Sequence, residues 1–276
     1  MAVRSPLLRK FLVYRIDAIP ELRSGVIHDY VYKCVFTSDG TSKETSAARF
    51  RDLDSIACTI ISEHKLDAIH DVGVSSGVTS LALYRKLAAT GLSLSFCISD
   101  KYAVYGRAGR CPVRIIDAQG SVRELYVCGI LGNREDVTRK FPVTRFLYWL
   151  LAARRYSEPV HWFALFDHEV LQHIRRGLIR TVDYDVFATR MADTFSFVRC
   201  MNLLNWNYFP LKSIESALRN LVESLKEGGV LQIGRTLEDG TNHAGFYQKH
   251  GTGLELLQEV GSGTELRELI AKRFGG

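Results

Sequence analysis

The sequence predicts an α/β fold with a mostly parallel sheet, on the strength of two strand-and-helix stretches and the chain length. Ala68–Val72 reads as a buried strand that leads through glycines into a helical pattern over Val78–Ala89. A largely apolar run begins at Phe195 and precedes a helical pattern over Leu211–Leu225 and a strand-like run at Val230–Arg235. Strands that alternate with helices favour parallel pairing, and 276 residues are enough for a large core.

The part of the chain before this sheet predicts a helical segment. Residues 1–60 read as an N-terminal helical cap, with helical patterning around Ala47–Glu63. The second strand is expected at Leu92–Asp100, where strict alternation is not required because a central parallel strand is buried on both faces. The third strand is expected at Ile179–Val186. We therefore expect residues 61–276 to form the main domain.

The interval between the second and third strands reads as a long insertion, residues 103–178. Val113–Val127 contains two β-like runs around a glycine, which is typical of a hairpin. Phe146–Ala153 is apolar all round and too short to span a bilayer. It predicts a helix buried under the insertion, a lid over an active site, or a contact with a membrane surface. We expect the insertion to serve as a lid or substrate wall, with the interface of a homo-oligomer as the alternative.

Positive charge is concentrated in the same interval. Between Ala103 and Arg180 the chain has thirteen Lys and Arg against seven Asp and Glu, and this excess equals the net charge of the whole chain, +6. Arginine favours partners with acidic or phosphate groups, whereas the alternative is a solvated surface. The interval lacks a recognisable nucleic-acid-recognition motif, so we predict no specific nucleic acid partner.

The turn after the first strand is the most informative stretch of the chain. It reads Asp71-Val72-Gly73-Val74-Ser75-Ser76-Gly77, a D-x-G-x-x-x-G pattern in which Ser75 replaces the middle glycine of a dinucleotide-binding turn. Glycines permit a tight turn and a close approach, and the backbone N–H groups at a helix start attract polar or anionic ligand groups. Asp71, at the strand end, can hold a cationic or hydroxyl group. A purely structural turn is the alternative.

This turn and the later half of the chain together resemble the class I S-adenosylmethionine-dependent methyltransferases. The later half runs from a strand and a helix into a turn, Lys226-Glu227-Gly228-Gly229, and another strand. The resemblance covers about residues 57–100 and 179–260, and Asn202–Asn205 is similar to a segment of chemotaxis-receptor methyltransferases. It implies a seven-stranded, mostly parallel, Rossmann-like sheet closed by an antiparallel hairpin at Ala244–Lys249 and Gly253–Val260, with S-adenosyl-L-methionine as cofactor.

The resemblance also implies roles for residues at the strand ends, where open α/β sheets bind their ligands. The methionine part of the cofactor would lie against the glycine turn, with Asp71, Gly73, Ser75 and Gly77 expected to line it. The ribose hydroxyls would bind Asp100, at the end of the second strand. The adenine amino group would meet Asp185 with the backbone of Val186, at the end of the third strand, and the sulfonium would lie beside Asn202. Ser75 and Ser196 depart from the family pattern, which leaves room for a site that no longer methylates.

The acid that binds the ribose has a second candidate. Trp162–Asp167 also reads as a strand that ends in an acid, and a helix over His168–Arg176 follows it directly. Chain order favours Asp100 because it comes first after the turn and its helix. The alternative for Asp167 is a structural role as the cap of the helix at His168.

Two residues are candidates for proton transfer on the acceptor side. His243 is expected in a loop after the fifth strand, where an imidazole could remove a proton from a hydroxyl or amine acceptor. Tyr208 follows the strand that ends near Asn205. The alternatives are a solvated histidine and a tyrosine that packs against Trp206 or Phe209.

Other features limit the class of protein. The N-terminus lacks a signal-peptide pattern, no apolar run is long enough to cross a membrane, and the six cysteines are scattered without a C-x-x-C pair, as in reduced cytoplasmic proteins. His168 and His173 are five residues apart and so lie on different helix faces, and we expect no metal site.

The leading prediction is therefore a methyltransferase that acts on an oxygen or nitrogen of a small or medium-sized acceptor. Two alternatives stay open: a protein that binds the cofactor or a partner without catalysis, and a methyltransferase that acts on protein or RNA. An enclosed acceptor cavity would favour the small-molecule enzyme, and an open basic groove would favour the macromolecular one.

Overall fold

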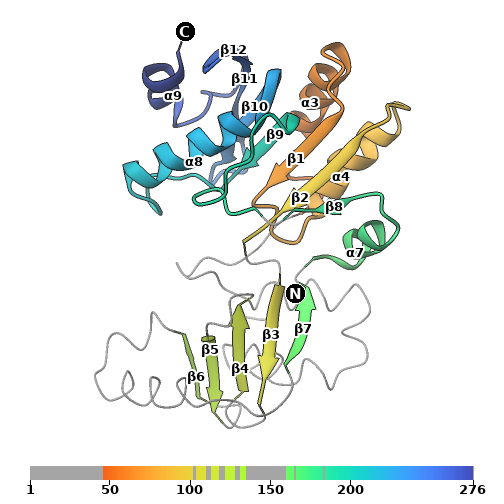
Figure 1. Ribbon diagram of the computed structural model, residues 1–276, viewed down its shortest axis with the longest axis vertical. Helices are drawn as coiled ribbons and strands as arrows, with labels where there is room; N and C mark the ends of the chain where they lie inside the picture. The colour runs from red at the N-terminus through yellow and green to blue at the C-terminus, as the bar shows by residue number, and fades with distance from the viewer. Residues whose placement is uncertain are drawn as a thin grey trace. The chain divides into compact units, whose positions relative to one another are not determined.

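The computed structural model describes residues 46–101, 104–109, 113–117, 122–127, 131–134, 160–164, 166–182 and 184–275. The chain divides into two compact units. One comprises Thr45–Lys101 and Val170–Gly276, and the other comprises Met1–Glu44 and Tyr102–Glu169. Figure 1 shows the described helices and strands of both. Each unit has a sheet of its own.

A seven-stranded sheet forms the centre of the first of these units, with the order β12-β11-β10-β9-β1-β2-β8. Neighbours from β10 to β8 pair in parallel, and β11 and β12 add an antiparallel hairpin. This arrangement confirms the fold class, a seven-stranded, mostly parallel α/β sheet. The strands are β1 (Ala68–Val72), β2 (Ser95–Ser99), β8 (Arg180–Thr181), β9 (Phe195–Met201), β10 (Leu225–Thr236), β11 (Asn242–His250) and β12 (Gly253–Val260).

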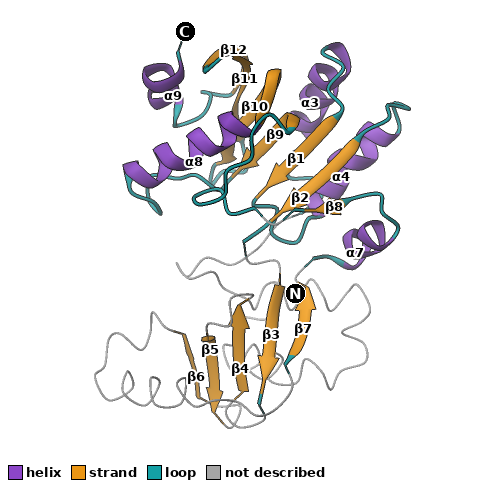
Figure 2. Cartoon of the chain, in the orientation of Figure 1, coloured by secondary structure: helices purple, strands orange, loops and turns teal. Residues whose placement is uncertain are grey.

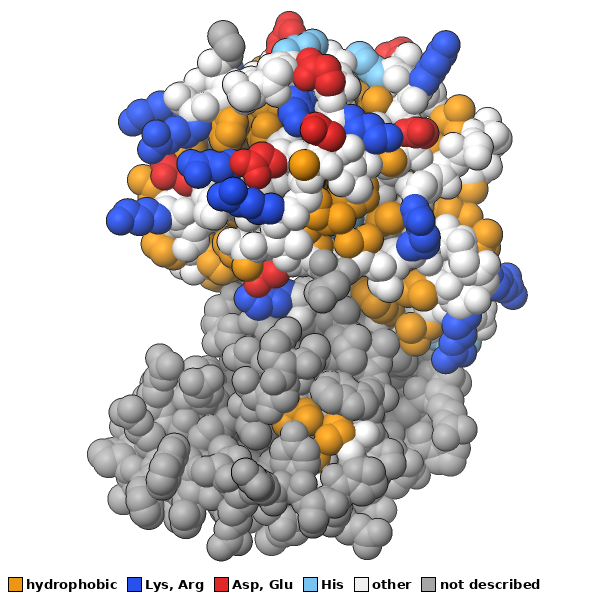
Figure 3. All heavy atoms as spheres, viewed as in Figure 1, with side chains coloured by type: hydrophobic (Ala, Val, Ile, Leu, Met, Phe, Trp, Pro, Cys, Tyr) orange, Lys and Arg blue, Asp and Glu red, His pale blue; other side chains and the backbone are white. Residues whose placement is uncertain are grey.

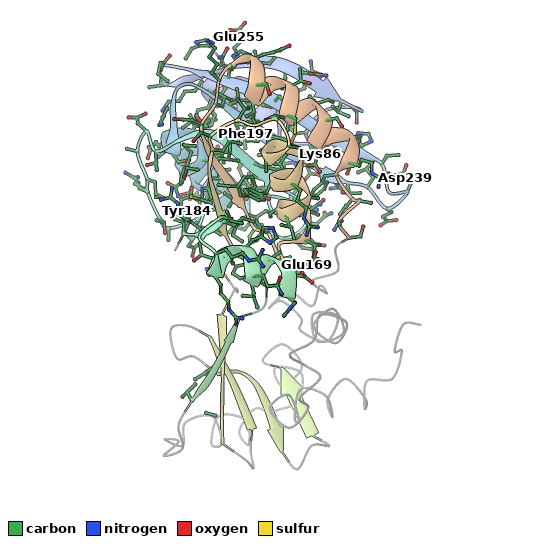
Figure 4. The ribbon with its side chains drawn as sticks, turned by 90° about the vertical axis from the view of Figure 1, so that its right-hand side faces the viewer. Lys86, Glu169, Tyr184, Phe197, Asp239 and Glu255 are labelled. Carbon is green, nitrogen blue, oxygen red and sulfur yellow. The ribbon has the colours of Figure 1, made fainter. Side chains whose placement is uncertain are left out.

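Helices cover both faces of this sheet (Figure 2). The described helices are α3 (Arg51–Glu63), α4 (Val78–Ala88), α7 (His168–Arg175), α8 (Leu211–Ser224) and α9 (Arg267–Phe274). Helix α8 buries an apolar stripe, Ile214, Ala217, Leu218 and Leu221, at helical spacing in the main core cluster. On the other face α3 and α4 pack together, and Lys86 of α4 donates to the carbonyl of Arg51 and the hydroxyl of Ser55 (Figure 4).

The third strand is shorter than the sequence predicts. Only Arg180 and Thr181 pair with β2, although the apolar pattern continues to Val186. The chain leaves the sheet because Asp185 starts a turn, in which its carbonyl accepts hydrogen bonds from the N–H groups of Ala188 and Thr189 at 3.0 and 2.7 Å. The apolar residues Tyr184 and Val186 are buried in the core without belonging to a strand.

The other unit contains a five-stranded antiparallel sheet with the order β6-β5-β4-β3-β7. Its strands are β3 (Val104–Ala108), β4 (Val113–Asp117), β5 (Val122–Val127), β6 (Leu131–Arg134) and β7 (His161–Ala164). The pair β4 and β5 confirms the predicted hairpin. Close packing requires Gly106 of β3, since a Cβ there would lie 2.6 Å from Val160 Cγ1. The predicted helix Phe146–Ala153 lies outside the described residues, and the role of the insertion stays a prediction.

Within the described residues, no helix combines the length and the apolar character needed to cross a membrane. In the same part of the chain, no three His, Cys, Asp or Glu side chains are grouped so that they could hold a metal ion.

Candidate functional site

The parallel strands all end at one edge of the seven-stranded sheet. Along the chain the parallel strands come in the order β1, β2, β8, β9 and β10. In the sheet β2 and β8 lie on one side of β1, and β9 and β10 lie on the other, so the strand order reverses between β1 and β9. Ligands of doubly wound sheets bind outside the carboxyl ends of the strands at this switch point. The residues that follow these strands here are Gly73–Gly77, Asp100, Asp185 and Asn202.

The glycine turn has an unusual backbone. Gly73, Ser75 and Gly77 all have positive φ angles, of 73°, 56° and 79°. Ser75 therefore replaces a glycine in the sequence and still takes the left-handed conformation, which is uncommon for a residue with a side chain. Gly77 is the N-cap of α4. The turn predicted from the sequence is present, and it keeps its tight conformation despite the serine.

The end of β2 closes one side of this turn. The carbonyl of Ser99 accepts hydrogen bonds from the N–H groups of Gly73 at 2.8 Å and Val74 at 3.2 Å. The carboxylate of Asp100 accepts a third bond, from the N–H of Ser75 at 2.7 Å. These N–H groups hold the turn against β2. The structure thus brings Asp100 into direct contact with the glycine turn.

Asp167 occupies a different place. The strand before it, β7, pairs with β3 in the five-stranded sheet and not with the parallel strands. Its carboxylate accepts a hydrogen bond from the N–H of Glu169 at 2.8 Å, in the first turn of α7. This bond is the structural capping role that stands as the alternative for Asp167 in the sequence.

Asp71 points away from the strand ends and into the protein. The Ser80 hydroxyl donates to its Oδ2 at 2.6 Å, and the Arg199 guanidinium donates to the same oxygen. Arg199 also donates to Asp54 Oδ1 of α3 at 2.8 Å. The cation and hydroxyl that the sequence pattern predicts at Asp71 therefore come from the protein itself. Asp71 joins β1 to the first turn of α4. Arg199 joins β9 to β1 through Asp71 and to α3 through Asp54.

These charges are buried, and burial acts on the pKa values of Arg199 and Asp54. Arg199, Asp54 and Asp71 are 0, 2 and 4% exposed. Burial lowers the pKa of Arg199, but attraction to Asp71 and Asp54 outweighs burial, so the net shift is upward. Burial raises the pKa of Asp54, against the opposing effect of Arg199. Sequence reasoning missed Arg199 and Asp54, although an arginine inside the apolar run Phe195–Met201 is a signal, because a buried charge requires a partner.

A neutral histidine lies beside this network. His70 of β1 is fully buried, and its Nε2 lies 2.9 Å from the hydroxyl of Ser99 at the end of β2. Burial lowers the pKa of His70 to about 4, and outweighs the nearby Asp71, which acts in the opposite direction. The ring is therefore uncharged at neutral pH and links β1 to β2 by a hydrogen bond.

The loop after β8 presents Asp185 at the same edge. Asp185 Oδ1 accepts a hydrogen bond from the N–H of Phe187 at 3.1 Å, and its Oδ2 lies 2.8 Å from the ammonium of Lys101. The carbonyl of the buried residue Val186 accepts a bond from Asn220 of α8 at 2.8 Å. Both predicted adenine-binding residues are thus held in a fixed turn.

Asn202 joins the ends of β9 and β10. Its φ is 57°, its Oδ1 accepts from the N–H of Thr236 at 2.7 Å, and its Nδ2 lies 3.4 Å from the Thr236 hydroxyl. The next residue, Leu203, packs against the glycine turn, since a Cβ at Gly73 would lie 3.0 Å from Leu203 Cδ2. The loops after β1 and β9 therefore meet at the switch point.

The two candidates for proton transfer lie farther along the chain. His243 belongs to β11 and not to a loop, and its Nδ1 accepts from the N–H of Ser262 at 2.9 Å. Its Nε2 lies 3.3 Å from the hydroxyl of Thr241. Tyr208 is 48% exposed, and the side chains of Trp206 and Leu211 are also exposed. Figure 3 shows hydrophobic, acidic and basic side chains interspersed on the face of this unit that it presents.

Comparison with known proteins gives structural matches alone. No family model matches the sequence, and no curated protein matches it. An S-adenosylmethionine-dependent methyltransferase from Clostridium acetobutylicum is 12% identical, with 83% of this chain and 79% of that chain covered and a TM-score of 0.38. The amino pentose methyltransferase CalS10 from Micromonospora echinaspora, bound to S-adenosylmethionine, is 12% identical, with 79% and 69% covered and a TM-score of 0.34.

The N-methyltransferase NodS from Bradyrhizobium japonicum is 13% identical, with 67% of each chain covered and a TM-score of 0.32. Likeness at these values indicates nothing about the chemistry of this chain. The strand order and the residues at the switch point are the features that bear on its function.

Proposed function

We propose that the protein is a class I S-adenosylmethionine-dependent methyltransferase. One observation carries the proposal: a glycine turn, two acids and an asparagine follow four adjacent parallel strands around the switch point of the sheet. The resemblance of the sequence motifs to this family supports the same conclusion. The proposed reaction is methyl transfer to an oxygen or nitrogen of a small or medium-sized acceptor, with acidic or phosphate groups favoured by the basic insertion.

The residues at the switch point fit the chemistry of the cofactor. Asp100 and Asp185 carry carboxylates that suit the ribose hydroxyls and the adenine amino group, which are hydrogen-bond donors. Gly73 packs directly against Leu203, since a Cβ there would lie 3.0 Å from Leu203 Cδ2, so a side chain at this position would displace the loop after β9. In our proposal the methionine part lies along Gly73, Ser75 and Gly77. Asp71 supports this turn from inside, through its bond to Ser80.

The cofactor would supply an activated methyl group on a sulfonium, so the protein has to align the acceptor and exclude water. In this proposal Asn202, held by Thr236, lines the reacting centre. His243 or Tyr208 would take the proton that a hydroxyl or amine acceptor loses. Because Nδ1 of His243 accepts from the N–H of Ser262, the neutral ring carries its proton on Nε2, so His243 can act as the base only after this bond is released.

One observation favours a second function, cofactor binding without methylation. Both polar atoms of the Asn202 side chain face Thr236, and the N–H groups of Gly73 and Ser75 are used within the protein. Polar groups that bond one another leave fewer contacts to align an acceptor with the methyl group, so the cofactor would bind without transfer. Turnover distinguishes the two functions, because a sensor would bind the cofactor and methylate nothing.

The test is a titration of the full chain with S-adenosylhomocysteine by calorimetry, followed by transfer of a labelled methyl group to panels of hydroxyl, amine, peptide and RNA acceptors. Binding together with labelling of a small acceptor supports the proposal. Binding with no labelled product in any panel supports the second function. A folded protein that releases no heat at millimolar ligand overturns both.

A further inference from the structure

An ion pair joins two loops of the candidate site. Lys101 follows Asp100 at the end of β2, and its ammonium lies 2.8 Å from Asp185 Oδ2 in the loop after β8. The two side chains are 45 and 27% exposed. Because β2 and β8 are adjacent parallel strands, the pair bridges the two loops that carry the acids of the site.

The loop itself orients the carboxylate of Asp185 from the other side. The N–H of Phe187 donates to Oδ1 at 3.1 Å. The backbone around Asp185 is closed by Thr189, whose N–H donates to the Asp185 carbonyl at 2.7 Å and whose hydroxyl accepts from the Asp185 N–H at 3.1 Å. One oxygen is thus positioned by the turn, and Lys101 positions the other.

We propose that Lys101 is a positioning residue that fixes Asp185 as the acceptor for the exocyclic amino group of the cofactor's purine, and so selects a 6-amino purine over a 6-oxo purine. This inference rests on the proposed function. A carboxylate has lone pairs for about four hydrogen bonds, so Asp185 can accept from Phe187, Lys101 and the ligand together. A 6-oxo purine presents an oxygen there, which a carboxylate held in this orientation repels.

The competing explanation is a surface ion pair that has no effect on ligand choice, since exposed pairs contribute little. The chain offers a matched control for it. Lys226, in β10, lies 3.5 Å from Asp67, and the two side chains are 43 and 68% exposed. Asp67 precedes β1, so this pair lies at the opposite edge of the sheet from the candidate site.

The experiment measures the Kd of S-adenosylhomocysteine and of S-inosylhomocysteine for the full chain and for Lys101→Met, Lys101→Arg and Lys226→Met. We expect Lys101→Met to weaken S-adenosylhomocysteine binding about three-fold, the scale of an exposed ion pair, and to leave the Kd of the 6-oxo ligand unchanged. The preference for the 6-amino ligand then falls by the same factor. In Lys101→Arg, which keeps the cation, and in Lys226→Met, the preference for the 6-amino ligand stays at the level of the unchanged protein.

A preference that is unchanged or larger in Lys101→Met overturns the inference, because Lys101 would then be neutral toward Asp185 or compete with the ligand for it. Equal weakening of both ligands overturns it too, since a general loosening of the loop would act in that way. Thermal unfolding of each variant separates such loosening from ligand choice. If the unchanged protein binds neither ligand, the proposed function itself fails.

Discussion

Arg199 and Asp71 lie opposite one another on adjacent parallel strands, β9 and β1, and form an ion pair that is almost completely buried. Asp54 of α3 accepts from the other nitrogen of the same guanidinium at 2.8 Å. A charge placed inside a sheet is tolerated only when its partners are fixed. This network therefore connects α3, β1, β9 and, through Ser80, the start of α4.

Removal of Arg199 should destabilise the protein strongly. We expect Arg199→Met to lower the free energy of unfolding by about 3–5 kcal/mol, because two buried carboxylates lose their cation. Urea unfolding measures the change. The control is Arg273→Met, which breaks an exposed pair with Glu215 and should cost less than about 1 kcal/mol. Losses of equal size in both variants would show that the buried network contributes no more than a surface pair.

Stability should depend on pH through His70. Burial lowers its pKa to about 4, whereas the unfolded chain titrates near 6.5. Between these values the unfolded state binds more protons, so stability rises with pH across this window. The contribution is complete above about pH 6.5 and is reduced by about 3 kcal/mol at pH 4.

The variant His70→Gln isolates this effect. Asp54, whose pKa is raised, makes stability fall with rising pH in acid. This contribution is present in the unchanged protein and in the variant, so the difference between them reports His70. Chemical unfolding at a series of pH values should show a shallower pH dependence for the variant between pH 4 and about 6.5. Parallel curves for the two proteins would mean that His70 is not buried as a neutral ring.

Ligand binding should depend on the space beside Gly73. Gly73→Val forces a side chain into a residue with φ 73° and places its Cβ 3.0 Å from Leu203, so we expect no binding of S-adenosylhomocysteine by calorimetry. Gly91→Val is the matched control, since Gly91 has φ 75° and a Cβ there would meet nothing within 4 Å. It should lose about 1–2 kcal/mol of stability from backbone strain and keep its affinity. Retained affinity in Gly73→Val would remove the turn from the site.

The two acids that compete for the ribose should separate in a binding experiment. Asp100→Ala is expected to weaken S-adenosylhomocysteine binding by about 1–3 kcal/mol, the value of a hydrogen bond to a charged group. It also removes the acceptor of the Ser75 N–H. Asp167→Ala should change affinity little, because this carboxylate caps α7. The reverse ranking would assign the ribose to Asp167.

Local patterns predict much of the parallel sheet. β1 has the bounds of the predicted strand Ala68–Val72, and α8 ends one residue before the predicted Leu225. The sequence could not predict that the chain after Thr181 leaves the sheet, because the turn at Asp185 depends on hydrogen bonds to Thr189. An apolar run fits a buried loop as well as a strand.

Contacts between distant residues account for what the sequence could not show of the site. Asp54 and Arg199 are 145 positions apart, and Lys101 meets Asp185 only because β8 pairs with β2. The sequence predicts His243 in a loop, and it lies in β11 because the chain reverses directly after β10. Glycine turns and strand-end acids are visible in sequence, whereas the partners that occupy those acids depend on strand order.

The two outermost strands of the described seven-stranded sheet limit self-association in different ways. A strand with unpaired backbone groups is a template for another chain. On one side β8 offers only Arg180 and Thr181, too short a row to template an added strand. On the other side β12 is eight residues long, and it carries Glu255 and Glu259 along its length. Charged side chains along an edge strand disfavour pairing with another chain, so these two glutamates oppose the addition of a strand there, whereas the exposed Leu256 and Leu257 of the same strand favour it.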